Sequence, residues 1–263
     1  MIKHSKYSLV AAILAGAVAA GCATDSAAGT VEAASAEVDS ATSEFGAVGT
    51  LESSEVHTID VSFDNADYDE LIEAYRSNGD KEWIEATVTI DGVTYERAGI
   101  RLKGNSSLFS LSASSDAETL PWLIKLDKYI NDQNYEGLTD LVVRSNSSTT
   151  ALNEAVALEL LEIAGLASQD AIAVEFSVDA AEPVLRLVIE HPDDLWMAEE
   201  FDADGALYKA ESTGDYTYRG NDPDAYDEVF DQEAGKDNAD LAPLIEFLDF
   251  INNSDDTTFV AEL

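Results

Sequence analysis

The stretch Gly99-Ile100-Arg101-Leu102-Lys103-Gly104-Asn105-Ser106-Ser107 combines a short apolar run, two cations and a loop of small residues. Glycine permits tight turns and serine adds hydroxyl donors, so such a loop can present hydrogen-bond donors to an anion. An ordinary hairpin turn can have the same composition, and that alternative stays open for the nine residues alone. The segments that follow favour anion binding.

A strand and a helix follow this loop, and each carries a charged residue. The apolar run 120–126 predicts a buried strand that contains Lys125, although lysine is rarely buried without a partner. Residues 150–165 predict a helix in which Glu159 lies within an apolar stripe. A carboxylate there requires a cationic partner or a raised pKa, and Lys125 is a candidate partner. The stripe comprises Leu152, Ala155, Val156, Leu160 and Ile163.

The order of loop, strand lysine and helix glutamate is that of the small lobe of protein-kinase-like folds. There the loop covers the nucleotide phosphates, and a lysine held by a glutamate contacts them. The alternative is a lysine that reaches solvent from a strand edge and a glutamate at the border of a stripe. We therefore predict an α+β fold: a kinase-like small lobe of mixed or antiparallel sheet plus one principal helix, followed by the start of a second lobe.

The nine-residue stretch, Lys125 and three later segments together resemble the CotH family, the spore-coat-protein-H-like atypical protein kinases. The later segments are residues 135–143, 187–193 and 205–211, and the resemblance covers residues 55–263. It implies a secreted or cell-surface protein with a degenerate kinase fold. Such a protein uses ATP and Mg²⁺ or Mn²⁺ to phosphorylate protein.

This resemblance also implies a nucleotide site. The loop would cover the phosphates, Lys125 would bridge them, Glu159 would orient Lys125, and Glu190 would lie near the nucleotide at the lobe junction. Arg101 and Lys103 would support the loop or the phosphates. The predicted nucleotide-binding residues are Arg101, Lys103, Gly104, Asn105, Ser106, Ser107, Lys125, Glu159 and Glu190.

Two features depart from the family pattern. Residues 184–189 replace a Gly-x-Tyr-x-Leu segment before Glu190. The family's metal-binding and catalytic aspartates lie downstream in Asn-Trp-Asp-like and Pro-Trp-Asp-like segments, whereas this sequence ends at Leu263 and its last tryptophan is Trp196. We therefore expect a truncated chain, catalytic residues beyond Leu263 and no useful phosphoryl transfer by residues 23–263. The alternative is a non-catalytic adhesion or scaffold module, as a pseudokinase remnant or gene fragment.

The start of the chain predicts export and a lipid anchor. A basic segment precedes the apolar run 9–20, which is too short to span a membrane. Small residues before Cys22 resemble a lipoprotein cleavage box, so residues 1–21 are predicted to be a lipoprotein signal peptide and Cys22 the lipidated first residue. A plain secretory signal is the alternative. Because Cys22 is the only cysteine, no disulfide partner is expected. The predicted location is the bacterial cell envelope, anchored to the membrane.

Composition divides the rest into a flexible acidic linker, 22–54, and a CotH-like domain, 55–263. The net charge of −39 argues against nucleic-acid partners and suits a halophilic source. The remaining cations gather in the family-like segments, which favours a phosphate pocket. They include Arg101, Lys103, Lys125, Lys128, Arg144 and Lys209.

The sequence predicts no metal site. The carboxylates between Asp222 and Asp231 lack the glycine turn and final glutamate of a calcium loop, so we interpret this segment as a solvated acidic loop. His57 and His191 lie far apart in the sequence without an evident third ligand, which makes zinc an unfavourable prediction.

Overall fold

The computed structural model describes residues 51, 53–109, 111–145, 150–201, 205–211 and 214–262. The predicted signal peptide, Cys22 and nearly all of the predicted linker lie outside the described residues. Within the described ranges, no helix has the length and apolar character needed to cross a membrane.

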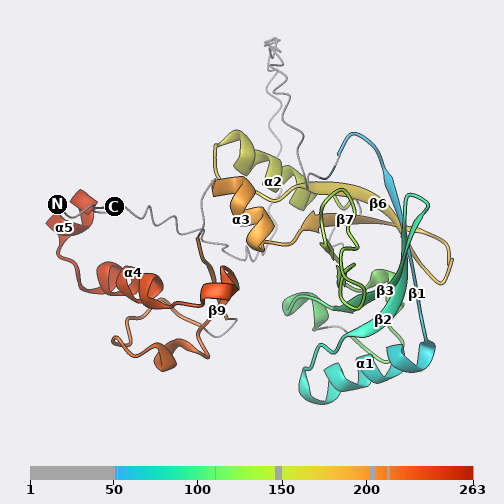
Figure 1. Cartoon of the computed structure of the whole chain (residues 1–263), viewed down its shortest axis with the longest axis horizontal. Coiled ribbons are helices and arrows are strands. Elements are labelled where there is room, and N and C mark those ends of the chain that lie inside the picture. Colours follow the sequence, from blue (N-terminus) through green and yellow to red (C-terminus); the bar gives the residue numbers. More distant parts are fainter. Residues whose placement is uncertain are drawn as a thin grey trace, which may run out of the picture.

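Seven strands form a closed barrel in the order β1-β2-β3-β4-β5-β7-β6 (Figure 1). Strands β1 and β6 pair in parallel and close the barrel, whereas all other neighbours pair antiparallel. The strands are β1 (His57–Phe63), β2 (Ile84–Ile90), β3 (Val93–Leu102), β4 (Trp122–Lys125), β5 (Asp140–Val143), β6 (Ala171–Val178) and β7 (Val184–Glu190).

Alternating apolar residues explain these strands. Ile59 and Val61 of β1 are buried, and a side chain two residues further along a strand returns to the same face. The β2–β3 hairpin turns at Asp91 and Gly92, whose φ angles of 47° and 82° are those of a type I′ turn. The strand predicted within 120–126 and the helix predicted within 150–165 are present, as Trp122–Lys125 and Asn153–Ile163.

The barrel interior holds the main hydrophobic core. Helix α1 (Asn65–Asn78) packs Leu71 and Ile72 against this core. Asp64 caps the helix by accepting from Ala66 N, and Gly79 ends it with a positive φ of 85°.

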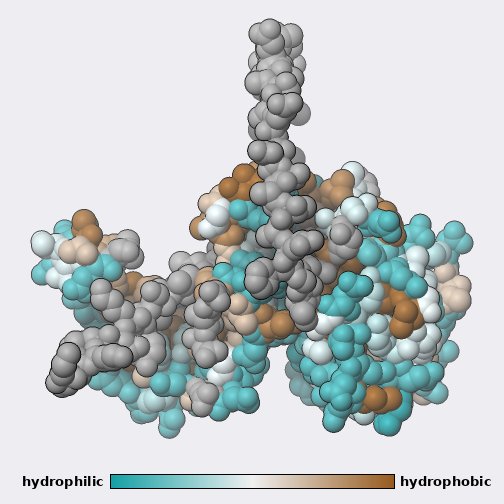
Figure 2. All heavy atoms as spheres, turned by 45° about the horizontal axis from the view of Figure 1, so that its top comes forward, coloured by the Kyte–Doolittle hydropathy of each residue, from teal (hydrophilic) through white to brown (hydrophobic). Residues whose placement is uncertain are grey.

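Helix α2 (Asn153–Ile163) lies against the outer face of the barrel. Its Ala155 and Leu158 pack on a cluster formed by Leu123, Val142, Leu187 and Ile189. Most of the predicted stripe points away from the barrel, and in Figure 2 hydrophobic residues gather at the top of the view, above the barrel. The exposed apolar side chains in and beside α2 are Leu152, Val156, Leu160, Leu161, Ile163 and Leu166.

A smaller second part follows the barrel and reaches the opposite end of the long axis (Figure 1). Helix α3 (Asp194–Phe201) leads into a two-stranded sheet of β8 (Leu207–Ala210) and β9 (Phe230–Ala234). Helices α4 (Ala242–Asn253) and α5 (Asp256–Glu262) complete the described chain. The second core comprises Tyr226, Val229, Phe230, Leu244, Ile245 and Leu248.

The predicted fold class is wrong. The described residues form a closed seven-stranded mixed barrel, a small separate sheet and five α-helices instead of a kinase-like small-lobe sheet with one principal helix. The parallel β1–β6 pairing causes the difference, because it joins the two ends of the strand order and leaves no free edge.

Candidate functional site: a cationic face beside an Asp-His-Asp group

The outer face of the barrel carries the charged residues that the sequence singled out. Along β3, Ile100 and Leu102 point into the core, so Arg101 and the following Lys103 lie on the opposite face. Antiparallel register places Arg101 opposite Leu123 and Gly99 opposite Lys125. Arg101, Lys103 and Lys125 therefore lie on one outer surface of the barrel, which we call the cationic face.

Trp83 supports this surface from the side. The guanidinium carbon of Arg101 lies 4.8 Å from the centre of the Trp83 ring, and Lys128 Nζ lies 4.9 Å from it. A Cβ at Gly99 would come within 2.6 Å of the Lys128 side chain and 3.0 Å of Trp83. Glycine at this position therefore permits the close packing that orients both cations.

The small-residue loop turns at Gly104, whose φ is 99°. A Cβ there would meet Ser107 Oγ at 2.3 Å, so the turn excludes larger residues. Asn105 Oδ1 accepts a hydrogen bond from Lys81 Nζ over 2.9 Å, which ties the loop to a further lysine. Asn105, Ser106 and Ser107 are exposed, so their polar groups are accessible to a ligand.

Lys103 is the most unusual cation of this face. Burial, aided by Lys209, Arg101 and Arg144, lowers its pKa to about 8 even though Glu233 opposes the shift. Among the described residues, neither Lys103 nor Arg101 forms an ion pair. We define the cationic cluster as Lys81, Lys103 and the cations that lower the pKa of one or both of them, namely Arg101, Arg144 and Lys209.

The predicted pairing of Lys125 with Glu159 does not occur. Lys125 Nζ instead lies 2.8 Å from Asp140 Oδ1 and 3.0 Å from Asp127 Oδ1, and Glu159 is exposed on α2. Burial would lower the pKa of Lys125, but the two carboxylates outweigh it and raise the pKa. Lys125 and Asp140 are directly opposed in the β4–β5 register, which explains the observed partner.

A different glutamate of α2 contacts a cation. Glu154 lies in the first turn of α2. Arg144 Nε donates a hydrogen bond to Glu154 Oε2 over 2.8 Å, and Arg144 NH2 lies 2.8 Å from Glu154 Oε1. This bidentate pair fixes the start of α2 against the end of β5.

Glu190 ends β7 with a buried carboxyl group. Its Oε2 accepts from Asp170 N over 2.8 Å, and its backbone carbonyl accepts from Gln169 Nε2 over 2.7 Å. Burial raises its pKa to about 7, helped by the carboxylates of Asp170, Glu199 and Glu200 and opposed by the Asp170 amide. These contacts give Glu190 a role in holding the segment before β6.

Helix α3 brings the second part to the cationic face. Trp196 Nε1 donates to Ser168 O over 2.8 Å, while the Trp196 ring packs with Leu207 and Ala234 of the small sheet. In that sheet, Lys209 Nζ lies 2.6 Å from Glu233 Oε1. Lys209 and Glu233 are close enough to Lys103 to affect its pKa, so the cationic cluster spans both parts of the molecule.

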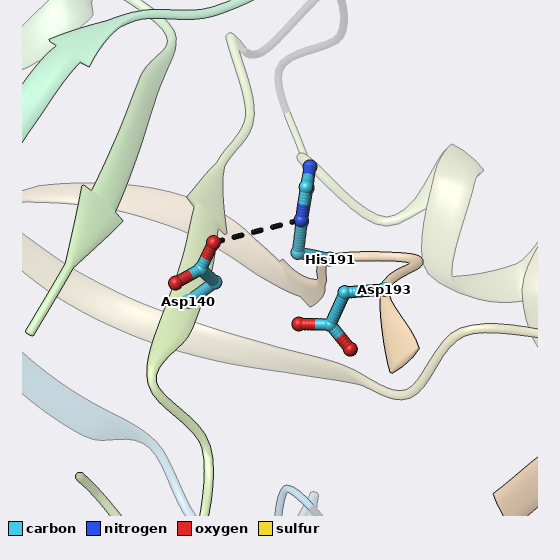
Figure 3. Close-up of side chains that lie close together, drawn as sticks. All are labelled: Asp140, His191 and Asp193. Atoms are coloured by element: carbon cyan, nitrogen blue, oxygen red, sulfur yellow. Dashed lines mark ion pairs between the residues drawn. The ribbon is translucent and has the colours of Figure 1, made fainter. Parts of the chain in front are cut away.

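Three side chains at the edge of this face form a group that the sequence did not predict (Figure 3). One ligand atom each from Asp140, His191 and Asp193 lies within 4.8 Å of the others. His191 Nδ1 is 3.6 Å from Asp140 Oδ2. Burial and Lys103 lower the pKa of His191 to about 4, which keeps its imidazole neutral at neutral pH. The sequence offers no evident third ligand for His191, whereas the structure places two carboxylates beside it, from the start of β5 and from the residue before α3.

A comparison with known protein families bears on the identity of the chain. A profile described as CotH kinase protein matches residues 100–263, more than half of the sequence. The chain belongs to the CotH kinase family. No curated protein matches it.

CotH membership implies use of a nucleotide and a divalent metal, and the residues of the cationic face fit the phosphates of the nucleotide. Arg101 and Lys103 are cations without ion-pair partners in the described chain, in a protein of net charge −39. The matched region starts at Ile100 in β3, so it contains Arg101, Lys103, the small-residue loop and the Asp-His-Asp group.

Proposed function

We propose that this CotH family member binds ATP on the cationic face, with the phosphates against Lys103 and Arg101. The observation that carries this proposal is the partly buried Lys103 without an ion-pair partner among the described residues. A buried charge is costly unless it is paired, and a phosphate supplies the missing negative charge. The exposed Asn105, Ser106 and Ser107 provide hydrogen-bond donors on the same side.

Other residues have supporting roles in this proposal. Lys81 holds the loop by donating a hydrogen bond to Asn105. Lys125 pairs with the carboxylates of Asp127 and Asp140, so its role is to position Asp140. Lys209 approaches from the small sheet, which lets the second part contribute to binding. When bound, Mg²⁺ or Mn²⁺ would neutralise phosphate charge.

A pair of methionine variants tests the ATP site. Lys103→Met removes the central charge, and Arg76→Met removes an exposed cation of α1 as the matched control. Equilibrium dialysis with radiolabelled ATP is expected to detect at least a tenfold affinity loss in Lys103→Met and none in Arg76→Met, with unchanged far-ultraviolet circular dichroism. Equal affinity of wild type and Lys103→Met, or no binding by wild type, would refute the proposal.

Phosphoryl transfer from ATP to a protein is the reaction that the family suggests for this chain. Incorporation of radiolabelled phosphate into a protein acceptor, dependent on a divalent metal and reduced in Lys103→Met, supports it. Binding of ATP without any transfer would restrict the function to nucleotide binding.

We further propose export of the protein and anchoring in the bacterial membrane through lipidated Cys22, with an extracellular protein as substrate and no nucleic acid partner. The basic and apolar start of the sequence and the single cysteine support this location. Radiolabelled palmitate is expected to label the wild type in its host, whereas Cys22→Ala should be unlabelled and released from the membrane fraction. Equal labelling of both would refute the anchor.

The second candidate function is a non-catalytic adhesion module. The exposed apolar side chains of α2 favour it, because large exposed apolar patches commonly mark interaction sites. Attachment of cells to a protein-coated surface separates the candidates. Loss in Leu160→Gln/Ile163→Gln with retention in Lys103→Met supports adhesion, and retention in both variants refutes it.

A further inference from the structure

We infer that Asp140, His191 and Asp193 bind a divalent transition-metal ion, with Mn²⁺ as the ion to test. The three donors come from the start of β5, the residue after β7 and the residue before α3 (Figure 3). This group is separate from the downstream aspartates that the family resemblance implies.

The separation of the donor atoms suits one ion. Ligands at about 2.1 Å from a metal lie at most about 4.2 Å apart. The three donors lie within 4.8 Å of one another, so small rotations of the two aspartate side chains complete the site.

Existing contacts orient each carboxylate through its Oδ1 atom. Asp140 Oδ1 accepts from Lys125 Nζ over 2.8 Å, and its Oδ2 faces His191. Asp193 Oδ1 accepts from Leu195 N over 2.9 Å and from Trp196 N over 3.2 Å at the start of α3. Outer contacts of this kind orient ligands in metal sites.

The environment of His191 gives independent support for a metal site. Its Nδ1 atom is buried and makes no hydrogen bond within the described part of the chain. The separation of 3.6 Å from Asp140 Oδ2 is too long for a hydrogen bond. A metal ion between the two atoms would satisfy both of them. Imidazole favours transition metals over Mg²⁺, which prefers oxygen ligands.

The position of the group links the ion to the proposed ATP site. Lys103, Lys209 and Glu233 all influence the electrostatics of His191, so the ion would lie beside the cationic cluster. The role of the ion next to phosphate rests on the proposed function, whereas metal binding itself does not.

Electron paramagnetic resonance of Mn²⁺ without nucleotide tests the site. Binding removes the signal of the free ion, and a large excess of Mg²⁺ competes for the many surface carboxylates. Wild type is expected to bind one Mn²⁺ under these conditions, and His191→Gln and Asp193→Asn should each lose at least tenfold in affinity. Asp224→Asn, an exposed carboxylate of the acidic segment, is the control and should bind as wild type.

Two further measurements keep the outcomes distinct. Mn²⁺ should raise the thermal unfolding temperature of wild type but not of His191→Gln, whose fold is checked by circular dichroism. Lys103→Met should retain Mn²⁺ binding even if it loses ATP, so failure of the ATP site leaves the metal result intact. Equal Mn²⁺ affinity in wild type and His191→Gln, or equal loss in Asp224→Asn, would overturn the inference.

Discussion

Glu190 carries a buried carboxyl group whose pKa is raised from 4.5 to about 7. In this pH interval the folded state keeps a proton that the unfolded state has lost, so this group's contribution to stability falls as pH rises from 4.5 to about 7. Glu190→Gln cannot ionise and should remove that part of the pH dependence. Relative to wild type, the free energy of unfolding of the variant should rise by on the order of 1–3 kcal/mol as the pH increases from 4.5 to about 7.

Urea unfolding of both proteins across this interval measures the difference. Asp231→Asn, an exposed carboxylate of β9, serves as the control for general charge effects. Parallel curves of unfolding free energy against pH for wild type and Glu190→Gln would show that burial does not raise the pKa of this carboxyl group.

The charge of Lys103 should make ATP affinity depend on pH at alkaline values. Its pKa of about 8 means that the free protein loses this positive charge as pH rises through that value, in a setting that also holds Arg101, Arg144, Lys209 and the Glu233 carboxylate, whose pKa is lowered. ATP affinity should therefore fall above about pH 8. Lys103→Arg should retain affinity to higher pH, because arginine stays protonated. Calorimetric titration across the range checks this, and identical pH profiles for the two proteins would contradict it.

The residues of the candidate site were predictable to different degrees. Arg101 and Lys103 could be found because small residues and cations adjoin in the sequence. The partner of Lys125 was missed because a helical stripe reveals periodicity but not orientation, whereas strand register fixes Asp140 opposite Lys125. Antiparallel pairing of the Lys125 strand with residues 140–143 is the signal that could have found it.

At the scale of elements, the strands were predictable but their closure was not. Alternation identifies β1 and β6 separately, since each has its own apolar face. Their parallel pairing joins His57 with Val174 across the chain, and no local pattern encodes such a contact. A sheet and a barrel made of the same strands therefore have similar sequence patterns.

Helix α2 offers a direct test of which face packs on the barrel. Leu158 contacts the outer cluster, whereas Leu160 is 59% exposed. Leu158→Ala should cost about 1–2 kcal/mol of unfolding free energy, since it removes packed methyl groups. Leu160→Ala should change stability by less than about 0.5 kcal/mol. Urea denaturation of the two variants compares these values, and a larger loss in Leu160→Ala would mean that the predicted stripe faces the barrel.

For the whole molecule, the site depends on elements that are distant in the sequence. Asp140 and His191 meet only because β5 and β7 are neighbours, although β6 separates them along the chain. Lys209 joins them because Trp196 anchors the small sheet to the barrel. Without this topology, the sequence indicates only one member of the Asp-His-Asp group, His191, as a candidate ligand.

The net charge of the molecule predicts a stability that rises with salt. The sequence has 53 acidic and 14 basic residues, so repulsion among carboxylates outweighs the few ion pairs. Raising NaCl from about 0.1 to about 1 M shortens the screening length from about 10 to about 3 Å, and we expect the unfolding temperature to rise by about 5 °C or more.

Neutralising two exposed carboxylates of α1, in Asp69→Asn/Glu70→Gln, should raise the low-salt unfolding temperature and reduce the salt increment. Scanning calorimetry of both proteins measures this, with KCl as a second salt to separate screening from ion-specific effects. A fall in unfolding temperature with salt would mean instead that pairs such as Lys125–Asp140 and Arg144–Glu154 dominate the electrostatics of the folded chain.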